Sequence, residues 1–261
     1  MITSTDLRHD QAEGLRRIFS EPRSRLITLV STLPPTEKDA MLVNLTASFS
    51  RTGNDVLLVD ARSGDTGIAT HFWQASTLTL EDAVTQNAPP DKARQRVREG
   101  FDFMRLFNGG ARKESLKLAS AFNSIQKQAA QVILVDGEPD ADGALPLKAM
   151  EEGILLLQVT ATVESMTSAY SLVKRLHMQL GRRQFDIVVS NTDETKADVV
   201  SKNLATAAKR HLAVALNCVG SIPDDPHLKQ ATRLGKAITD AFPLAEASLA
   251  YKRIATQLIS N

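Results

Sequence analysis

Short, fully apolar runs alternate along this chain with segments in which apolar residues recur at helical spacing. The runs at 26–30 and 56–59 are rich in β-branched residues and too short for helices, which favours strands buried on both faces. Between them Met41, Leu45 and Phe49 recur every four residues, as on the buried side of a helix. The order strand, helix, strand is typical of a parallel sheet.

The same alternation continues to the end of the chain. Strands are expected at 102–107, 131–136 and 186–191, a helix followed by a strand at 145–160, and helices at 77–84, 115–130, 163–176 and 248–258. The pattern therefore predicts an α/β protein with a mostly parallel central sheet and helices on both faces. Its length of 261 residues suits one large domain, expected at 25–261, because no linker divides it.

Residues 1–24 are polar and form a short N-terminal appendage. Within it Leu7, Gln11, Leu15 and Ile18 lie on one stripe if the segment is helical. So short a helix is marginal by itself, and we expect it to order only on docking. The alternative is a tail that packs on its own domain.

Composition narrows the classes of function. The net charge of +1 argues against nucleic-acid binding driven by bulk charge. No apolar run has transmembrane length and no apolar signal core opens the chain, so a cytoplasmic location is expected. The five histidines lack metal-ligand spacing. Membrane contact is expected to be weak at most, because the helix at 248–258 carries only the charges of Lys252 and Arg253, which favours packing.

Basic residues cluster after the loop at 87–90. They are Lys92, Arg94, Arg96 and Arg98. A solvated helix face is favoured over a site for a polyanion.

The predicted helix after the first strand carries Val43-Asn44-Leu45, a short distance after Lys38. This order resembles the MinD/ParA-like P-loop ATPases, in which a Lys-Gly-Gly-x-Gly-Lys-Thr loop precedes a helix with Val-Asn-Leu. The resemblance implies the MinD-like fold and places Lys38 on the lysine that holds phosphate. The alternative is a solvated lysine in the first turn of a helix.

The rest of the loop departs from the family pattern. Leu33 stands at the signature lysine, which in the family reaches across a dimer to the partner's nucleotide, and Pro34 and Pro35 replace the paired glycines. Glu37 and Asp39 replace the last glycine and the hydroxyl that binds magnesium. Proline removes a backbone donor, and each carboxylate at about 4 Å from a phosphate oxygen costs roughly 4 kcal/mol. The sequence therefore predicts a degenerate loop and no cofactor.

Acids end two later strands, as they do in the family. Asp60 follows one apolar run, and Asp136 stands where the family has its Walker B acid. Arg62 replaces an acid that the family is thought to use to position the attacking water, and Asn191 matches an asparagine that reads adenine. The resemblance thus implies a vestigial nucleotide site without a catalytic residue, made of Lys38, Asp39, Asp60, Asp136 and Asn191.

The appendage contains Asp-Gln-Ala-Glu-Gly-Leu-Arg-Arg at positions 10–17. It is similar to the Asp-Gln-Ala-x-x-Leu-Arg motif of the FlhG (also FleN) branch of the family, the regulators of flagellar number and placement. That motif is understood to stimulate FlhF, a signal-recognition-type GTPase. The resemblance implies that Asp10, Gln11, Leu15 and Arg16 bind such a GTPase, and that the core meets a flagellar switch protein or the flagellar transcription activator.

Three hypotheses follow. The first is a pseudo-ATPase, a regulatory binding protein that keeps the fold and an N-terminal GTPase activator. The second is a working ATPase with an unorthodox loop, which would need ATP and Mg²⁺. The third is another MinD-like positioning protein, against which the motif at 10–17 argues.

Overall fold

A single sheet organises the residues that the computed structural model describes, which are 24–62, 68, 78–97, 100–109, 114–128 and 130–260. Within these ranges eight strands are ordered β3-β4-β2-β5-β1-β6-β7-β8. The strands are β1 (Arg25–Ser31), β2 (Val56–Asp60), β3 (Gln95–Arg96), β4 (Asp102–Arg105), β5 (Val132–Asp136), β6 (Ile154–Thr160), β7 (Gln184–Ser190) and β8 (Ala215–Ile222). All neighbouring pairs are parallel except β3 and β4, so the predicted α/β architecture is confirmed.

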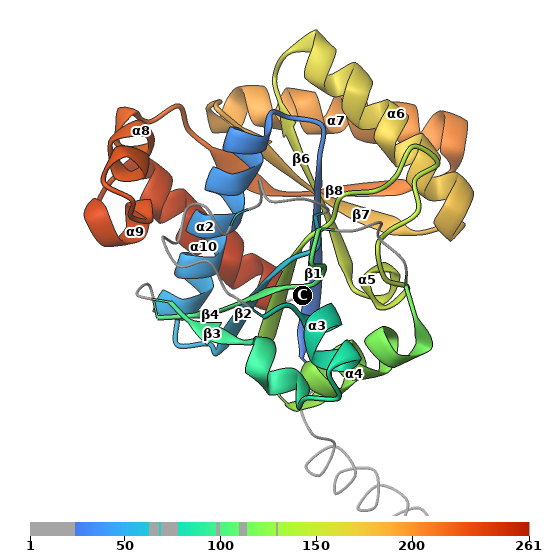
Figure 1. Ribbon diagram of the computed structural model, residues 1–261. Helices are drawn as coiled ribbons and strands as arrows, with labels where there is room; N and C mark the ends of the chain where they lie inside the picture. The colour runs from blue at the N-terminus through green and yellow to red at the C-terminus, as the bar shows by residue number, and fades with distance from the viewer. Residues whose placement is uncertain are drawn as a thin grey trace, which may run out of the picture.

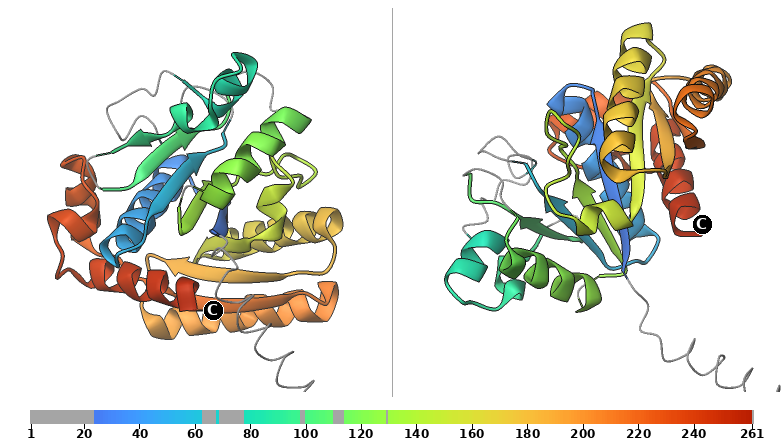
Figure 2. Two further views of the ribbon diagram at one scale, coloured as in Figure 1. Left: turned by 90° about the horizontal axis from the view of Figure 1, so that it is seen from below. Right: turned by 90° about the vertical axis from the view of Figure 1, so that its right-hand side faces the viewer.

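Helices cover both faces of the sheet (Figures 1 and 2). They are α2 (Pro35–Arg51), α3 (Leu80–Thr85), η2 (Pro90–Ala93), α4 (Leu116–Gln128), α5 (Ala149–Glu152), α6 (Val163–Leu180), α7 (Glu194–Leu212), α8 (Pro226–Arg233), α9 (Ile238–Ala241) and α10 (Glu246–Ser260). Two apolar cores result. One lies under α2, α9 and α10, and the other under α3 to α7.

The predicted apolar positions form these cores. All five residues of β2 and all five of β5 are buried, as expected for strands covered on both faces. On α2, Met41, Leu45 and Phe49 are at most 1% exposed. The helix ends at Arg51, and Gly53 then takes a positive φ of 87°, a conformation that glycine adopts without strain after a helix C-terminus.

The basic cluster after residue 90 does not form the predicted helix face, and that prediction is wrong. Lys92 lies in η2, and Arg96 belongs to β3, where it pairs with Asp102 of the antiparallel β4. Arg94 also forms an ion pair with Asp102. A cross-strand carboxylate, which helical periodicity cannot reveal, explains why these cations lie here.

The last helix packs on the sheet, as its apolar side predicted. On α10, Ala250, Ile254, Ala255 and Leu258 are at most 2% exposed. Its contacts are mainly with α2 and β8. None of the helices in the described ranges has the length and apolar character needed to cross a membrane.

Candidate functional site

The carboxyl ends of the central strands gather the residues that the sequence singled out. Asp60 ends β2 and Asp136 ends β5, and the two residues are register partners in adjacent parallel strands. The loop after β1 leads at the same edge into the first turn of α2, which carries Lys38 and Asp39. Parallel strands end at one edge of a sheet, so topology alone brings these four residues together.

Lys38 points into this edge and forms an ion pair with the carboxylate of Asp136. Its Nζ also donates to the backbone oxygen of Gly137 at 3.3 Å. The side chains of Lys38 and Asp136 are 8% and 0% exposed. The alternative of a solvated lysine is therefore wrong, because the amino group is buried and satisfied by protein oxygens.

Arg62 joins the cluster from the other side. Its Nη2 lies 2.7 Å from Asp39 Oδ1, and its Nε lies 2.7 Å from Asp136 Oδ2 and 3.6 Å from Asp60 Oδ1. Its backbone N–H donates to Asp60 Oδ1 at 3.0 Å. A single cation at position 62 thus contacts every carboxylate of the cluster.

The charges nearly cancel. We call the five residues Lys38, Asp39, Asp60, Arg62 and Asp136 the ion network; it holds three carboxylates and two cations. Burial raises the pKa of Asp136, against the opposing influence of the two cations. Burial also disfavours the charge of Arg62, yet the three carboxylates raise its pKa above the ordinary value. Each charge therefore depends on the others.

Asp136 is held by opposite charges on both of its carboxylate oxygens. Lys38 pairs with Oδ1 and Arg62 Nε with Oδ2, and both oxygens are buried. A carboxylate in this position is held by opposite charge in a low-dielectric setting. Removal of either cation would leave it poorly compensated.

The first turn of α2 lacks the donors of a phosphate cradle. Pro34 occupies the N-cap, no side chain caps the helix, and Pro35 is its first residue. The N–H of Leu33 donates to Ser31 Oγ at 3.1 Å, and the N–H groups of Glu37 and Lys38 both point to the Pro34 oxygen. A helix N-terminus binds anions through free N–H groups, and here few remain.

Asn191 lies at the edge of the network and contacts Glu37. Its Nδ2 donates to Glu37 Oε2 at 3.2 Å, and the residue adopts a positive φ of 57°. Beside it Gln158 is 2% exposed, and its Nε2 lies 3.4 Å from the backbone oxygen of Glu37 and 3.3 Å from Ser190 Oγ. The amide of Asn191, which the resemblance assigns to adenine, is therefore already hydrogen-bonded to a side chain of the protein.

Gly137 keeps the network close to the sheet. A Cβ at this position would lie 2.4 Å from Thr28 Cγ2 and 3.0 Å from the Leu29 oxygen. Its N–H donates to that Leu29 oxygen at 2.9 Å. Only glycine lets the chain pass so near to β1, which positions the carbonyl that Lys38 contacts.

These residues do not fit a magnesium polyphosphate as they are arranged. The lysine amino group and the Walker B position neutralise each other, a second cation covers Asp39 and Asp60, and the helix offers few free donors. In the described part of the chain no group of three or more His, Cys, Asp or Glu side chains is placed to hold a metal ion.

The structure brings together all five residues of the predicted vestigial site except Asn191, which contacts the network's neighbour Glu37. Sequence reasoning noted Arg62 only as a lost acid and missed its role as the central cation. It also missed Gln158, for which the sequence carries no signal. Asp10, Gln11, Leu15 and Arg16 lie outside the described residues, so their predicted role stays a prediction.

Comparisons with known proteins agree with this architecture. The antiactivator FleN of Pseudomonas aeruginosa is 25% identical over 234 residues, which are 85% of this chain and 82% of FleN. Among solved structures, the cell division protein MinD of Aquifex aeolicus has a TM-score of 0.70 at 19% identity and covers 91% of this chain and 98% of its own. A ParA family ATPase of Chlorobium tepidum has a TM-score of 0.66 at 16% identity, covering 89% and 99%. No protein-family model matches the chain.

Proposed function

We propose that this chain, which has the fold of MinD and is similar to FleN over most of its length, is a regulatory binding protein of the FlhG (FleN) branch that works without ATP. One observation carries the proposal. The amino group of Lys38 is bound to Asp136, and Arg62 holds the remaining carboxylates of the edge. The charged side chains of the protein thus make with one another the contacts that a nucleotide and a metal ion would need.

Energetics support this proposal. A nucleotide would have to take Lys38 from a fully buried carboxylate, and breaking a buried pair costs about 3–5 kcal/mol. It would also meet the carboxylate of Glu37, with too few free N–H groups to compensate. A loss of about 4 kcal/mol in binding free energy is close to a thousandfold in Kd. ATP is therefore expected to bind too weakly to control this protein.

Isothermal titration calorimetry with ATP or ADP and Mg²⁺ tests the proposal on the full chain. We expect no binding in the micromolar range. A variant in which P34G, P35G, E37G, D39T and R62D restore the family pattern is expected to gain binding, because Lys38, Asp60 and Asp136 stay in place. Micromolar binding by the unaltered chain would overturn the proposal in favour of a working ATPase.

We further propose that the segment at 10–17 stimulates an FlhF-type GTPase in trans. The similarity of this segment to the FlhG motif supports the proposal, and Gln11 lies on the same predicted stripe as Leu7 and Leu15. A glutamine amide both donates and accepts, so it can orient a water or a phosphate oxygen in a partner's active site. Arg16 adds a charge that affects association.

GTP turnover by the FlhF-type enzyme of the same organism, with and without the full chain, tests this second proposal. The Q11A variant is expected to lose the stimulation. Glu13 lies off the stripe, so E13A is the matched control and should stimulate as the unaltered chain does. Equal stimulation by Q11A, or none by the unaltered chain, would contradict the proposal.

For the core we propose an antiactivator role like that of FleN, exerted on a flagellar transcription activator by protein contact. The similarity to FleN over most of both chains supports it. Pull-down of the activator by the full chain, equal in the presence and absence of ATP, is the expected result. Capture that requires ATP would contradict the nucleotide-free part of the proposal.

A further inference from the structure

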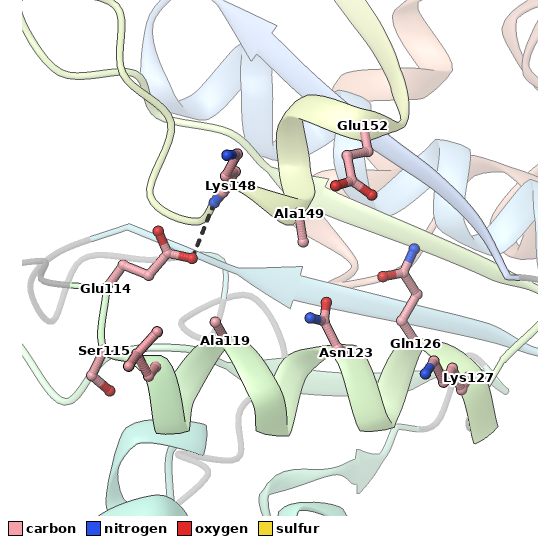
Figure 3. Close-up of a pocket in the computed structure, with 10 residues that line it drawn as sticks. Glu114, Ser115, Ala119, Asn123, Gln126, Lys127, Lys148, Ala149 and Glu152 are labelled. Carbon is pink, nitrogen blue, oxygen red and sulfur yellow. Dashed lines mark hydrogen bonds between the residues drawn. The ribbon is translucent and has the colours of Figure 1, made fainter.

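A groove of 610 Å³ lies between α4 and α5, on the face of the sheet opposite α2 (Figure 3). Ala119, Asn123 and Gln126 of α4 point across it toward Ala149 and Glu152. None of the residues that line the groove belongs to the ion network, so the groove is a different surface from the proposed vestigial nucleotide site.

The groove offers an apolar strip inside a polar rim. Leu116 at the start of α4 is 92% exposed, and Ala119 and Ala149 are half-buried along the floor. Lys148 and Glu152 supply charges of opposite sign along the α5 wall. This distribution is typical of a surface that receives one side of an amphipathic helix.

The N-terminal appendage leaves the domain at one end of this groove. Ser24 Oγ hydrogen-bonds to the backbone oxygens of Gln126 and Ala130, so the chain before Ser24 starts beside the last turn of α4. Gln126 itself lines the groove. Any segment just before residue 24 is thus tethered at a high local concentration to this surface.

The length of the appendage fits that of the groove. The stripe from Leu7 to Ile18 spans twelve residues, or about 18 Å as a helix, and α4 is 13 residues long. Residues 19–23 remain as a connection. With Ile18 beside Gln126, the stripe runs along α4 and brings Leu7 to Leu116.

We propose that residues 7–18 dock as a helix in the groove between α4 and α5 and that this contact is autoinhibitory. Leu7, Leu15 and Ile18 cover Leu116, Ala119 and Ala149. Gln11 lies on the same stripe, so its side chain would point toward the groove when the segment is docked. A partner that needs Gln11 must first displace the segment. The autoinhibitory role rests on the GTPase activation proposed above, whereas the docking does not.

Hydrogen exchange measured by mass spectrometry on the full chain tests the docking. Amides of residues 6–19 are expected to exchange at least about tenfold more slowly in the unaltered chain than in the L116D variant. Leu244 is 87% exposed on another part of the surface, so L244D is the matched control and should leave the protection unchanged. Unchanged exchange in β1 and β5 shows that each variant is folded.

Equal exchange of residues 6–19 in the unaltered chain and in L116D overturns the proposal, whether both are fast or both are slow. Protection that grows with protein concentration also overturns it, since the groove then holds a second copy's segment. A failed nucleotide or GTPase experiment leaves this result unaffected, so the proposals fail separately.

Discussion

Lys38 and Asp136 form a buried ion pair across the carboxyl edge of the sheet, although the two residues lie far apart in the chain. The pair joins the first turn of α2 to the end of β5 without any bound group. The contact is formed by the protein's own side chains.

Asp136→Asn is expected to destabilise the protein by about 3–5 kcal/mol, because it leaves Lys38 and Arg62 buried without their shared carboxylate. The free energy of unfolding in urea measures the loss. Asp240→Asn is the control. It removes an ion pair with Arg51, whose side chain is 57% exposed, and is expected to cost less than about 1 kcal/mol. Equal losses in the two variants would show that the network is not a stabilising unit.

The chain is expected to stay monomeric whether or not ATP is present. Leu33 stands where the family's signature lysine reaches the partner's nucleotide, and its side chain has no charge to offer. Light scattering at increasing protein concentration, with and without ATP and Mg²⁺, gives the mass. A doubling of mass that requires ATP would contradict this expectation.

Asn44→Leu is expected to destabilise the fold by about 1–3 kcal/mol, since it leaves a buried donor unpaired. Asn44 Oδ1 accepts from the N–H of Ile238 at 2.7 Å, and its side chain also hydrogen-bonds the hydroxyl of Tyr251, whose pKa burial raises. Thermal unfolding measures the effect. Asn203 is exposed on α7, and Asn203→Leu should change stability by less than about 0.5 kcal/mol.

Asp225 is expected to make stability depend on acidity. Burial opposes its charge, but hydrogen bonds from the N–H groups of His227 and Ala247, and the His227 ring, lower the pKa of Asp225 below its usual value. A carboxylate with a lowered pKa in the folded state contributes stability that is present above its unfolded pKa, about 4, and is lost as pH falls through the folded value.

Unfolding in urea at pH 7 and near pH 3 checks this expectation. The difference in free energy of unfolding between the unaltered chain and Asp225→Ala should be about 0.5–2 kcal/mol at pH 7, the worth of an N-cap. It should shrink in acid. A difference that stays constant between the two pH values would contradict the role assigned to the Asp225 charge.

Most of the fold could be predicted because its strands are buried on both faces. In a chain that alternates them with amphipathic helices, apolar runs such as those in β2 and β5 indicate strands of a sheet that helices cover on both faces. Errors arose where the pattern is weak. The β3 strand has only two residues. Its Arg96 and the preceding Arg94 both pair with Asp102 on another strand, and no local periodicity reveals that partner.

The sequence predicted where the candidate site lies in the fold, but not which of its side chains pair with one another. Strand ends and the start of α2 locate Lys38, Asp60 and Asp136, since parallel strands end at one edge. Whether Lys38 faces water or a carboxylate depends on side-chain packing between segments distant in the chain. The alternative that Lys38 is solvated was wrong for that reason.

By itself the sequence determined the α/β class, most of the central strands, the buried residues of the core and the departure from a phosphate-binding loop, but not α7 (Glu194–Leu212) or the short elements η2, β3, α8 and α9. These follow from local periodicity and from residue chemistry that any conformation keeps. Only the tertiary structure decided that Arg62 contacts Asp39, Asp60 and Asp136 together, and that Ser24 meets the end of α4 beside a groove. Such contacts join residues distant in sequence, and burial sets their energies, so no pattern along the chain encodes them.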